Sequence, residues 1–178
     1  MDAEKPELRE LSKVLAVLLV EQGSYTYIDK LAQVSSKDLA LYHIRETLRD
    51  YNSLVSRGIN NEEAKVTADS IDFLEIESVI EKISNVSSVS ELREIVSFIT
   101  AQALAESARI KTRSTYSIGV KILDEFKSRG MSFGKDDELA EAIKRNQKEL
   151  AEKLGVDEDV ISDIARNRVL LRYLIRRG

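Results

Sequence analysis

The sequence predicts an all-α protein. Apolar residues recur at three- and four-residue spacing along most of the chain, and no stretch alternates apolar and polar side chains as a half-buried strand would. The one proline, Pro6, stands where a first helix would begin, a position at which its missing amide hydrogen would be unpaired anyway. Hydrophobic residues make up 43% of the chain and charged residues 33%, which is typical of a folded globular protein. We expect a multi-helix N-terminal bundle followed by a small helix-turn-helix-like C-terminal unit.

Three helices are predicted in the first third of the chain. The first runs from Pro6 to Gly23, where glycine can stop it. A turn then opens a short second helix. The third begins at a cap formed by Ser35 or Ser36 and ends at Gly58. All three should contribute to the core of the bundle.

In the middle of the chain, the sequence leaves the secondary structure of residues 59–70 open. Residues 59–70 are polar and fit a loop or a helix start, although a small strand is also possible there. Residues 71–83 show helical spacing. Ser88 and Glu91 have the spacing of a capping box, and no glycine or proline interrupts the following segment as far as residue 110. A long central helix should therefore begin near Ser88.

The boundary between the two units is predicted from turn-forming residues. Residues 114–117 should interrupt the central helix, so that residues 118–126 form a separate helix. Two glycines then fall within residues 128–134. We predict a helical bundle over residues 1–130 and a C-terminal unit over residues 131–178.

Residues 147–164 show the one motif with a defined spacing. Leucines and isoleucines would face the core of two helices, a small residue stands where the helices would cross, and a glycine permits a left-handed turn between them. These positions are Leu150, Ala151, Leu154, Gly155, Val156, Ile161 and Ile164. The segment resembles the helix-turn-helix of the Cro/repressor-type family, in which the second helix enters the DNA major groove.

The second helix of this motif is acidic on its exposed positions, which are Asp157, Glu158, Asp159 and Asp163. Carboxylates would meet DNA phosphates unfavourably, so the motif can equally serve contact with a protein.

Five arginines follow the motif and form the best nucleic-acid candidate of the sequence: Arg166, Arg168, Arg172, Arg176 and Arg177. Arg168, Arg172 and Arg176 are four residues apart, on one side of a predicted last helix. Guanidinium groups can pair with phosphates in a bidentate manner. The alternative is a solvated helix face whose arginines pair with acidic neighbours.

A second basic cluster is smaller. Arg109, Lys111 and Arg113 precede Tyr116, whose ring could stack on a base. The cluster offers positive charge beside one aromatic side chain, and by itself it is a weak indication of nucleic-acid binding.

No catalytic or metal site is predicted. The chain has no cysteine and a single histidine, His43, which we interpret as structural. The acidic run Asp136–Glu138 is interpreted as a helix cap rather than as a cation site. No Gly-rich phosphate loop is present. We therefore expect neither enzymatic activity nor a cofactor.

Composition also limits the location and source of the protein. The acidic start of the chain, with Asp2 and Glu4, is unlike a signal peptide, and the longest apolar run, 14–20, is far too short to span a membrane. We expect a cytoplasmic protein. A formal net charge of −4 argues against coating of nucleic acid by bulk charge, and the many charged residues agree with a heat-adapted, archaeal source.

Two main functions remain open at this level. The first is a non-enzymatic nucleic-acid-binding protein that contacts phosphates of DNA or RNA with little sequence preference. The second is a helical assembly subunit that acts through protein contacts. A third reading is a small transcriptional regulator, which would require a homodimer.

A further resemblance belongs to the assembly-subunit reading. Residues 24–32 and 99–104 resemble the small helical subunit of archaeal type I-A CRISPR surveillance complexes. That resemblance implies a non-catalytic antiviral protein that lines RNA-guided DNA within a larger particle.

Overall fold

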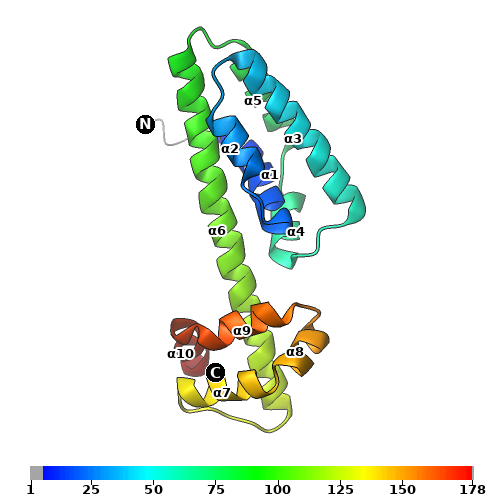
Figure 1. Cartoon of the computed structure of the whole chain (residues 1–178), viewed down its shortest axis with the longest axis vertical. Helices are drawn as coiled ribbons and strands as arrows, with labels where there is room; N and C mark the ends of the chain where they lie inside the picture. The colour runs from blue at the N-terminus through cyan, green and yellow to red at the C-terminus, as the bar shows by residue number, and fades with distance from the viewer. Residues whose placement is uncertain (1–5, 178) are drawn as a thin grey trace. The chain divides into compact units, whose positions relative to one another are not determined.

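The computed structural model describes residues 6–177, and these residues form ten α-helices and no strand (Figure 1). The predicted all-α class is confirmed. The helices are α1 Pro6–Gln22, α2 Thr26–Ala32, α3 Lys37–Arg57, α4 Glu62–Asp69, α5 Phe73–Ser84, α6 Val89–Ser128, α7 Asp136–Arg145, α8 Gln147–Leu154, α9 Glu158–Arg166 and α10 Arg168–Arg177. The acidic residues 2 and 4, used above to argue against a signal peptide, lie outside the described part of the chain.

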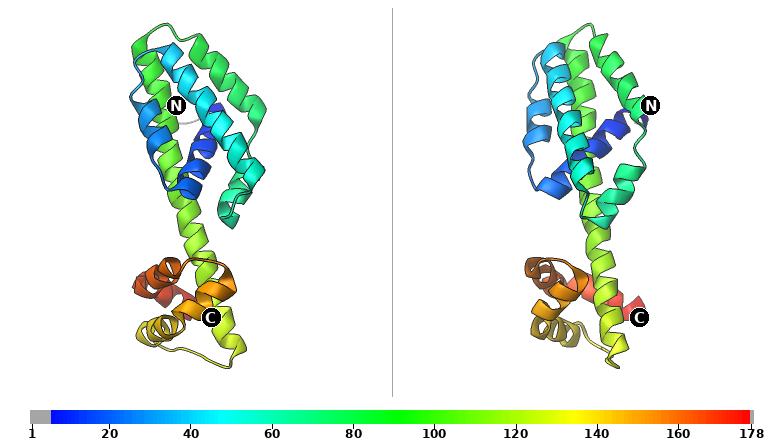
Figure 2. Two further views of the ribbon diagram at one scale, coloured as in Figure 1. Left: turned by 45° about the vertical axis from the view of Figure 1, so that its right-hand side comes forward. Right: turned by 90° about the vertical axis from the view of Figure 1, so that its right-hand side faces the viewer.

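The chain forms two compact units, which we call the N-terminal unit, ending at Lys111, and the C-terminal unit, beginning at Thr112. This boundary lies within α6 and not at the predicted position after residue 130. The reason is that Ile122 and Phe126, late in α6, are buried in the core of the C-terminal unit. Each unit therefore includes a part of α6, as Figure 2 shows from two further directions.

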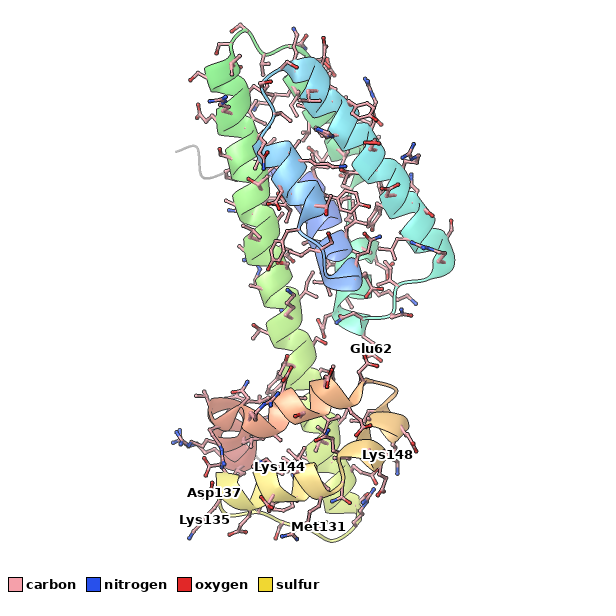
Figure 3. All side chains as sticks on the ribbon, viewed as in Figure 1. Glu62, Met131, Lys135, Asp137, Lys144 and Lys148 are labelled. Atoms are coloured by element: carbon pink, nitrogen blue, oxygen red, sulfur yellow. The ribbon has the colours of Figure 1, made fainter. Side chains whose placement is uncertain are left out.

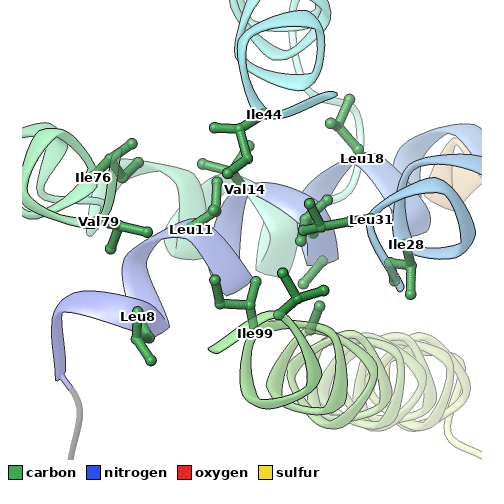
Figure 4. Packing of buried hydrophobic residues seen from close by; sticks show 14 of the residues in the cluster. Leu8, Leu11, Val14, Leu18, Ile28, Leu31, Ile44, Ile76, Val79 and Ile99 are labelled. Carbon is green, nitrogen blue, oxygen red and sulfur yellow. The ribbon is translucent and has the colours of Figure 1, made fainter. Parts of the chain in front are cut away.

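The core of the N-terminal unit is built around α1. Leu8, Leu11, Val14 and Leu18 of this helix meet residues of four other helices in Figure 4: Ile28 and Leu31 of α2, Ile44 of α3, Ile76 and Val79 of α5, and Ile99 of α6. The helix is also buried at positions 15–17 and 19. A helix with so wide an apolar surface must be covered by several others, and α1 meets this condition although Arg9, Glu10 and Lys13 leave one polar side.

Side-chain caps fix the beginnings of α3 and α4. The Ser36 hydroxyl accepts a hydrogen bond from the Leu39 amide at 3.2 Å, as one of the two predicted caps. Asn61 accepts from the Ala64 amide at 2.9 Å and so starts α4, which decides the ambiguous stretch 59–70 in favour of a helix start. The alternative of a small strand there was wrong, because the Asn61 cap satisfies an amide that a helix start exposes.

The central helix is longer than predicted. The Ser88 hydroxyl accepts from the Glu91 amide at 3.1 Å, as the capping-box spacing predicts, and α6 then continues for 40 residues. The predicted interruption at residues 114–117 was wrong. This segment has no glycine or proline, and Tyr116 packs against the core of the C-terminal unit, which keeps the backbone helical.

The C-terminal unit packs α7 to α10 around the last turns of α6. Its core contains Phe126 with leucines, isoleucines and alanines of all four shorter helices. Gly119 of α6 faces side chains of α10: a Cβ atom at this position would be 2.9 Å from Leu174 Cδ1. A side chain at residue 119 would therefore collide with α10 unless Leu174 moved.

Helices α8 and α9 have the local geometry predicted from the spacing of residues 147–164. Gly155 ends α8 in the left-handed conformation, with φ 68° and ψ 35°. The Val156 amide then donates to the Ala151 carbonyl at 3.0 Å. Leu150, Ala151, Ile161 and Ile164 are buried as expected. Among residues 6–177, no helix combines the length and the hydropathy needed to cross a bilayer.

Candidate binding face on the last helix

Helix α10 buries one side and exposes the other. Leu171 and Leu174 are buried in the core of the C-terminal unit. On the opposite side, 76% of Val169 and 52% of Tyr173 are exposed. We define the α10 outer face by its exposed side chains, Val169, Arg172, Tyr173, Arg176 and Arg177. No residue of α10 is acidic, so this face carries only positive charge of its own.

Two carboxylates at the beginning of α7 form ion pairs with arginines of α10. Arg172 Nε donates to Asp136 Oδ2 at 2.9 Å, and Arg168 forms an ion pair with Asp137, which Figure 3 labels at the start of α7. The hydrogen bond from Arg172 lowers the pKa of Asp136 below its usual range. The acidic run lies in the first turn of α7, but the cap predicted from it was wrong, because the residue at the cap position is Lys135 and no side chain accepts a capping hydrogen bond. Two of its carboxylates hold arginines of α10 instead.

Arg166 is occupied in the same way. Its guanidinium donates to Asp163 Oδ1 at 2.6 Å, one turn earlier in α9. Three of the five predicted arginines thus have acidic partners, as the solvated-face alternative anticipates. At least one side chain of each pair is largely exposed to solvent, and such pairs are weak enough to exchange partners.

The last two arginines are placed differently. Among the described residues, Arg176 forms no ion pair, and the Arg177 guanidinium carbon lies 5.9 Å from the centre of the Tyr116 ring. The Tyr116 ring is in turn 5.7 Å from that of Tyr173. The structure therefore brings Tyr116, predicted with the second basic cluster, next to the arginines of the first.

The remainder of the second basic cluster is dispersed. Arg109 belongs to the N-terminal unit, where its Nε donates to Glu106 Oε2 at 2.9 Å. Lys111 is the last residue of that unit, and Arg113 is an exposed residue of the other. Arg109 lines a pocket with residues of α1 that are far from it in sequence, and neither Lys111 nor Arg113 is among the residues that line this pocket.

The acidic residues of α9 are exposed as predicted: Asp157, Glu158, Asp159 and Asp163. They give the C-terminal unit a mixed surface. Its sequence from Thr112 onward holds 14 Lys and Arg against 12 Asp and Glu, for a formal charge of +2. Positive charge is therefore local to α10 rather than spread over the unit.

The single histidine lies at a polar pocket of about 240 Å³ in the N-terminal unit. His43 is partly buried, its ring meets that of Tyr42 edge to face, and its Nδ1 has no hydrogen-bond partner among the described residues. Tyr27 donates to Asp50 at 2.8 Å across the same pocket. Within residues 6–177, no group of three or more metal-ligating side chains is close enough to hold a metal ion.

The chain is similar in sequence to a protein from an archaeon. An uncharacterized protein of Archaeoglobus fulgidus is 48% identical over 101 residues, which cover 56% of this chain and 87% of the relative. This chain belongs to the same family. No protein-family model matches the sequence, and no solved structure matches it significantly. Because the relative is uncharacterized, family membership indicates no activity, and an archaeal relative agrees with the predicted archaeal source.

Proposed function

We propose that the protein is a non-enzymatic nucleic-acid-binding protein that contacts phosphate groups through the α10 outer face. The observation that carries this proposal is an exposed helix face that combines three arginines with an exposed tyrosine and has no acidic residue of its own. Guanidinium groups pair with phosphate oxygens, and such contacts carry no sequence information. The partner is therefore DNA or RNA bound with low sequence specificity.

The arginines contribute unequally in this proposal. Arg176 and Arg177 have no carboxylate partner among the described residues and supply the main phosphate contacts. Arg172 is 61% exposed in its side chain and can exchange Asp136 for a phosphate. Arg166 and Arg168 are left with Asp163 and Asp137. The helix-turn-helix-like pair α8 and α9 supports α10 through the shared core, and the acidic face of α9 points to a role other than base reading.

One observation favours a second function, that of a helical assembly subunit. Val169 and Tyr173 are both strongly exposed, and aromatic side chains beside arginines are enriched in protein interfaces. In this alternative α10 docks on a protein subunit of a larger complex, of which a CRISPR effector is one example, or on a second copy of the chain.

A charge-reversal experiment tests the first function. Fluorescence anisotropy of labelled single- and double-stranded DNA and RNA is measured at several salt concentrations for the wild type and for Arg176→Glu with Arg177→Glu. We expect micromolar binding that weakens with salt in the wild type and is lost in the variant. The matched control is Lys144→Glu with Lys148→Glu, two exposed lysines of the same unit labelled in Figure 3, which change the net charge equally.

The control decides what a loss of binding means. If both double variants lose binding alike, overall charge and not α10 is responsible. If the wild type binds none of the four nucleic acids, the phosphate-binding proposal is wrong. In that case, loss of self-association or of partner capture in Val169→Ala with Tyr173→Ala would support the assembly function.

A further inference from the structure

A second pocket of the N-terminal unit, of about 300 Å³, gathers positive charge from two helices that are distant in sequence. The residues that line it are Arg9, Ser12 and Lys13 of α1 and Gln102, Glu106 and Arg109 of α6. They follow helical spacing on each helix, so that each set lies on one side of its helix. The two sides together form the walls of the pocket.

A buried hydrogen bond fixes these walls relative to each other. The Ser12 hydroxyl donates to the Ile99 carbonyl of α6 at 2.9 Å, and Ser12 is almost fully buried. Ile99 is also part of the apolar core around α1 (Figure 4). The two helices that line the pocket are therefore joined next to it by a polar contact and by the core, which favours a preformed site.

The charges within the pocket are unbalanced. Three cations line it against one carboxylate, Glu106. Glu106 is paired with Arg109, and Lys13 with Glu10 at 3.0 Å. Arg9 is exposed and forms no ion pair with any side chain that the structure describes. This excess of positive charge is a local exception, because the sequence up to Lys111 holds 13 Lys and Arg against 19 Asp and Glu, for a formal charge of −6.

We propose that this pocket binds a small phosphate-bearing anion. Arg9 and Arg109 offer planar guanidinium groups that match phosphate oxygens, Lys13 adds a point charge, and the Gln102 amide can donate a hydrogen bond. The volume is at the lower end for ligand pockets, which suits a phosphate or diphosphate group and little more. The site goes beyond the nucleic-acid proposal, since it lies in the other unit and uses none of the α10 arginines.

Calorimetric titration of the full chain with inorganic pyrophosphate, in a buffer of low ionic strength, tests the site. We expect saturable binding by the wild type. Arg9→Gln and Arg109→Gln should each weaken it about tenfold or more, because each removes a charge-assisted contact. The matched control is Arg93→Gln, which removes an exposed arginine of α6 outside the pocket and should leave the affinity unchanged. Absent binding by the wild type, or equal weakening in Arg93→Gln, would overturn the proposal.

A variant that should bind pyrophosphate more tightly distinguishes loss of a contact from a folding defect, because misfolding can only weaken the binding. Glu106→Gln removes the one carboxylate of the pocket and should tighten pyrophosphate binding severalfold, whereas a damaged pocket would bind more weakly. Weaker binding in this variant would contradict an anion site. The titrations are repeated in the chain with Arg176→Glu and Arg177→Glu, which removes any pyrophosphate held by the α10 arginines. Binding at the pocket, and its weakening by Arg9→Gln and Arg109→Gln, should persist in this background, so failure of this site and failure of the α10 proposal are distinguishable.

Discussion

The two units reach a stable core in different ways. In the N-terminal unit one helix, α1, is buried along its length by the helices around it. In the C-terminal unit no shorter helix is buried on all sides, and each of α7 to α10 combines a buried stripe with exposed charged residues. The stability of the N-terminal unit therefore depends mainly on burial around α1. The stability of the C-terminal unit depends also on the close packing of α10 against Gly119 of α6 and on ion pairs at its surface.

The two groups of arginines, on α10 and in the pocket of the N-terminal unit, also differ in how the sequence places them. On α10 the arginines come from one helix and follow its periodicity. In the pocket of the N-terminal unit the arginines come from α1 and α6, which are distant in sequence, and only folding places Arg9 and Arg109 in the lining of one pocket. A pattern within one helix can be found in a sequence, whereas a pocket shared by two helices cannot.

The largest expected effect is a truncation in the centre of the N-terminal unit. Leu11→Ala should lower the free energy of unfolding of this unit by about 2–5 kcal/mol, because Leu11 is fully buried and its loss leaves a cavity. Urea denaturation followed by circular dichroism measures the loss, and hydrogen exchange assigns it to the unit. The control is Leu74→Ala on α5, where the leucine is 80% exposed and the change should stay within about 0.5 kcal/mol. Equal effects of the two variants would contradict the central role of α1.

A smaller effect is expected where α10 meets α6. Gly119→Leu should destabilise the C-terminal unit by about 1–3 kcal/mol through overpacking against Leu174 and Leu170. Gly119→Ala should do less, because alanine is favoured over glycine in a helix by about 1 kcal/mol. Gly134→Ala is the control, since no atom lies within 4 Å of the Cβ position there. The same denaturation and exchange measurements apply, and a neutral Gly119→Leu would show that the helices are not held this closely.

The smallest effect is a dependence on acid that belongs to the C-terminal unit. Hydrogen bonds from Lys153 and Arg129 lower the pKa of Glu125, as the bond from Arg172 lowers that of Asp136. Both carboxyl groups release their protons at lower pH in the folded chain than in the unfolded one, so their stabilising contribution is complete above the unfolded pKa of about 4. It is lost as the pH falls through the lower folded values.

Thermal unfolding between pH 6 and pH 3 measures this dependence. The melting temperature should decline below about pH 4, and Asp136→Asn with Glu125→Gln should flatten the decline. The exchange of amides in the C-terminal unit should follow the same pH range. An unchanged pH profile in the double variant would mean that these ion pairs contribute nothing measurable to the stability of the C-terminal unit.

Most helices were predictable because their signals are local. Glycines end α1 and α3 where expected, Ser36 and Ser88 provide their predicted caps, and Gly155 makes the left-handed turn between α8 and α9. Each of these depends on a few adjacent residues, whose hydrogen bonds and backbone conformation their own side chains determine.

Where the local sequence predicted a break but packing favoured a continuous helix, only the tertiary structure determined the outcome. Residues 114–117 stay helical because Tyr116 joins the C-terminal core, and that core also moves the unit boundary into α6. The sequence determined that the last helix would carry a row of arginines. That Asp136 and Asp137 would hold two of them, and that Arg9 and Arg109 would line one pocket, depends on contacts between helices far apart in the chain, which no local periodicity encodes.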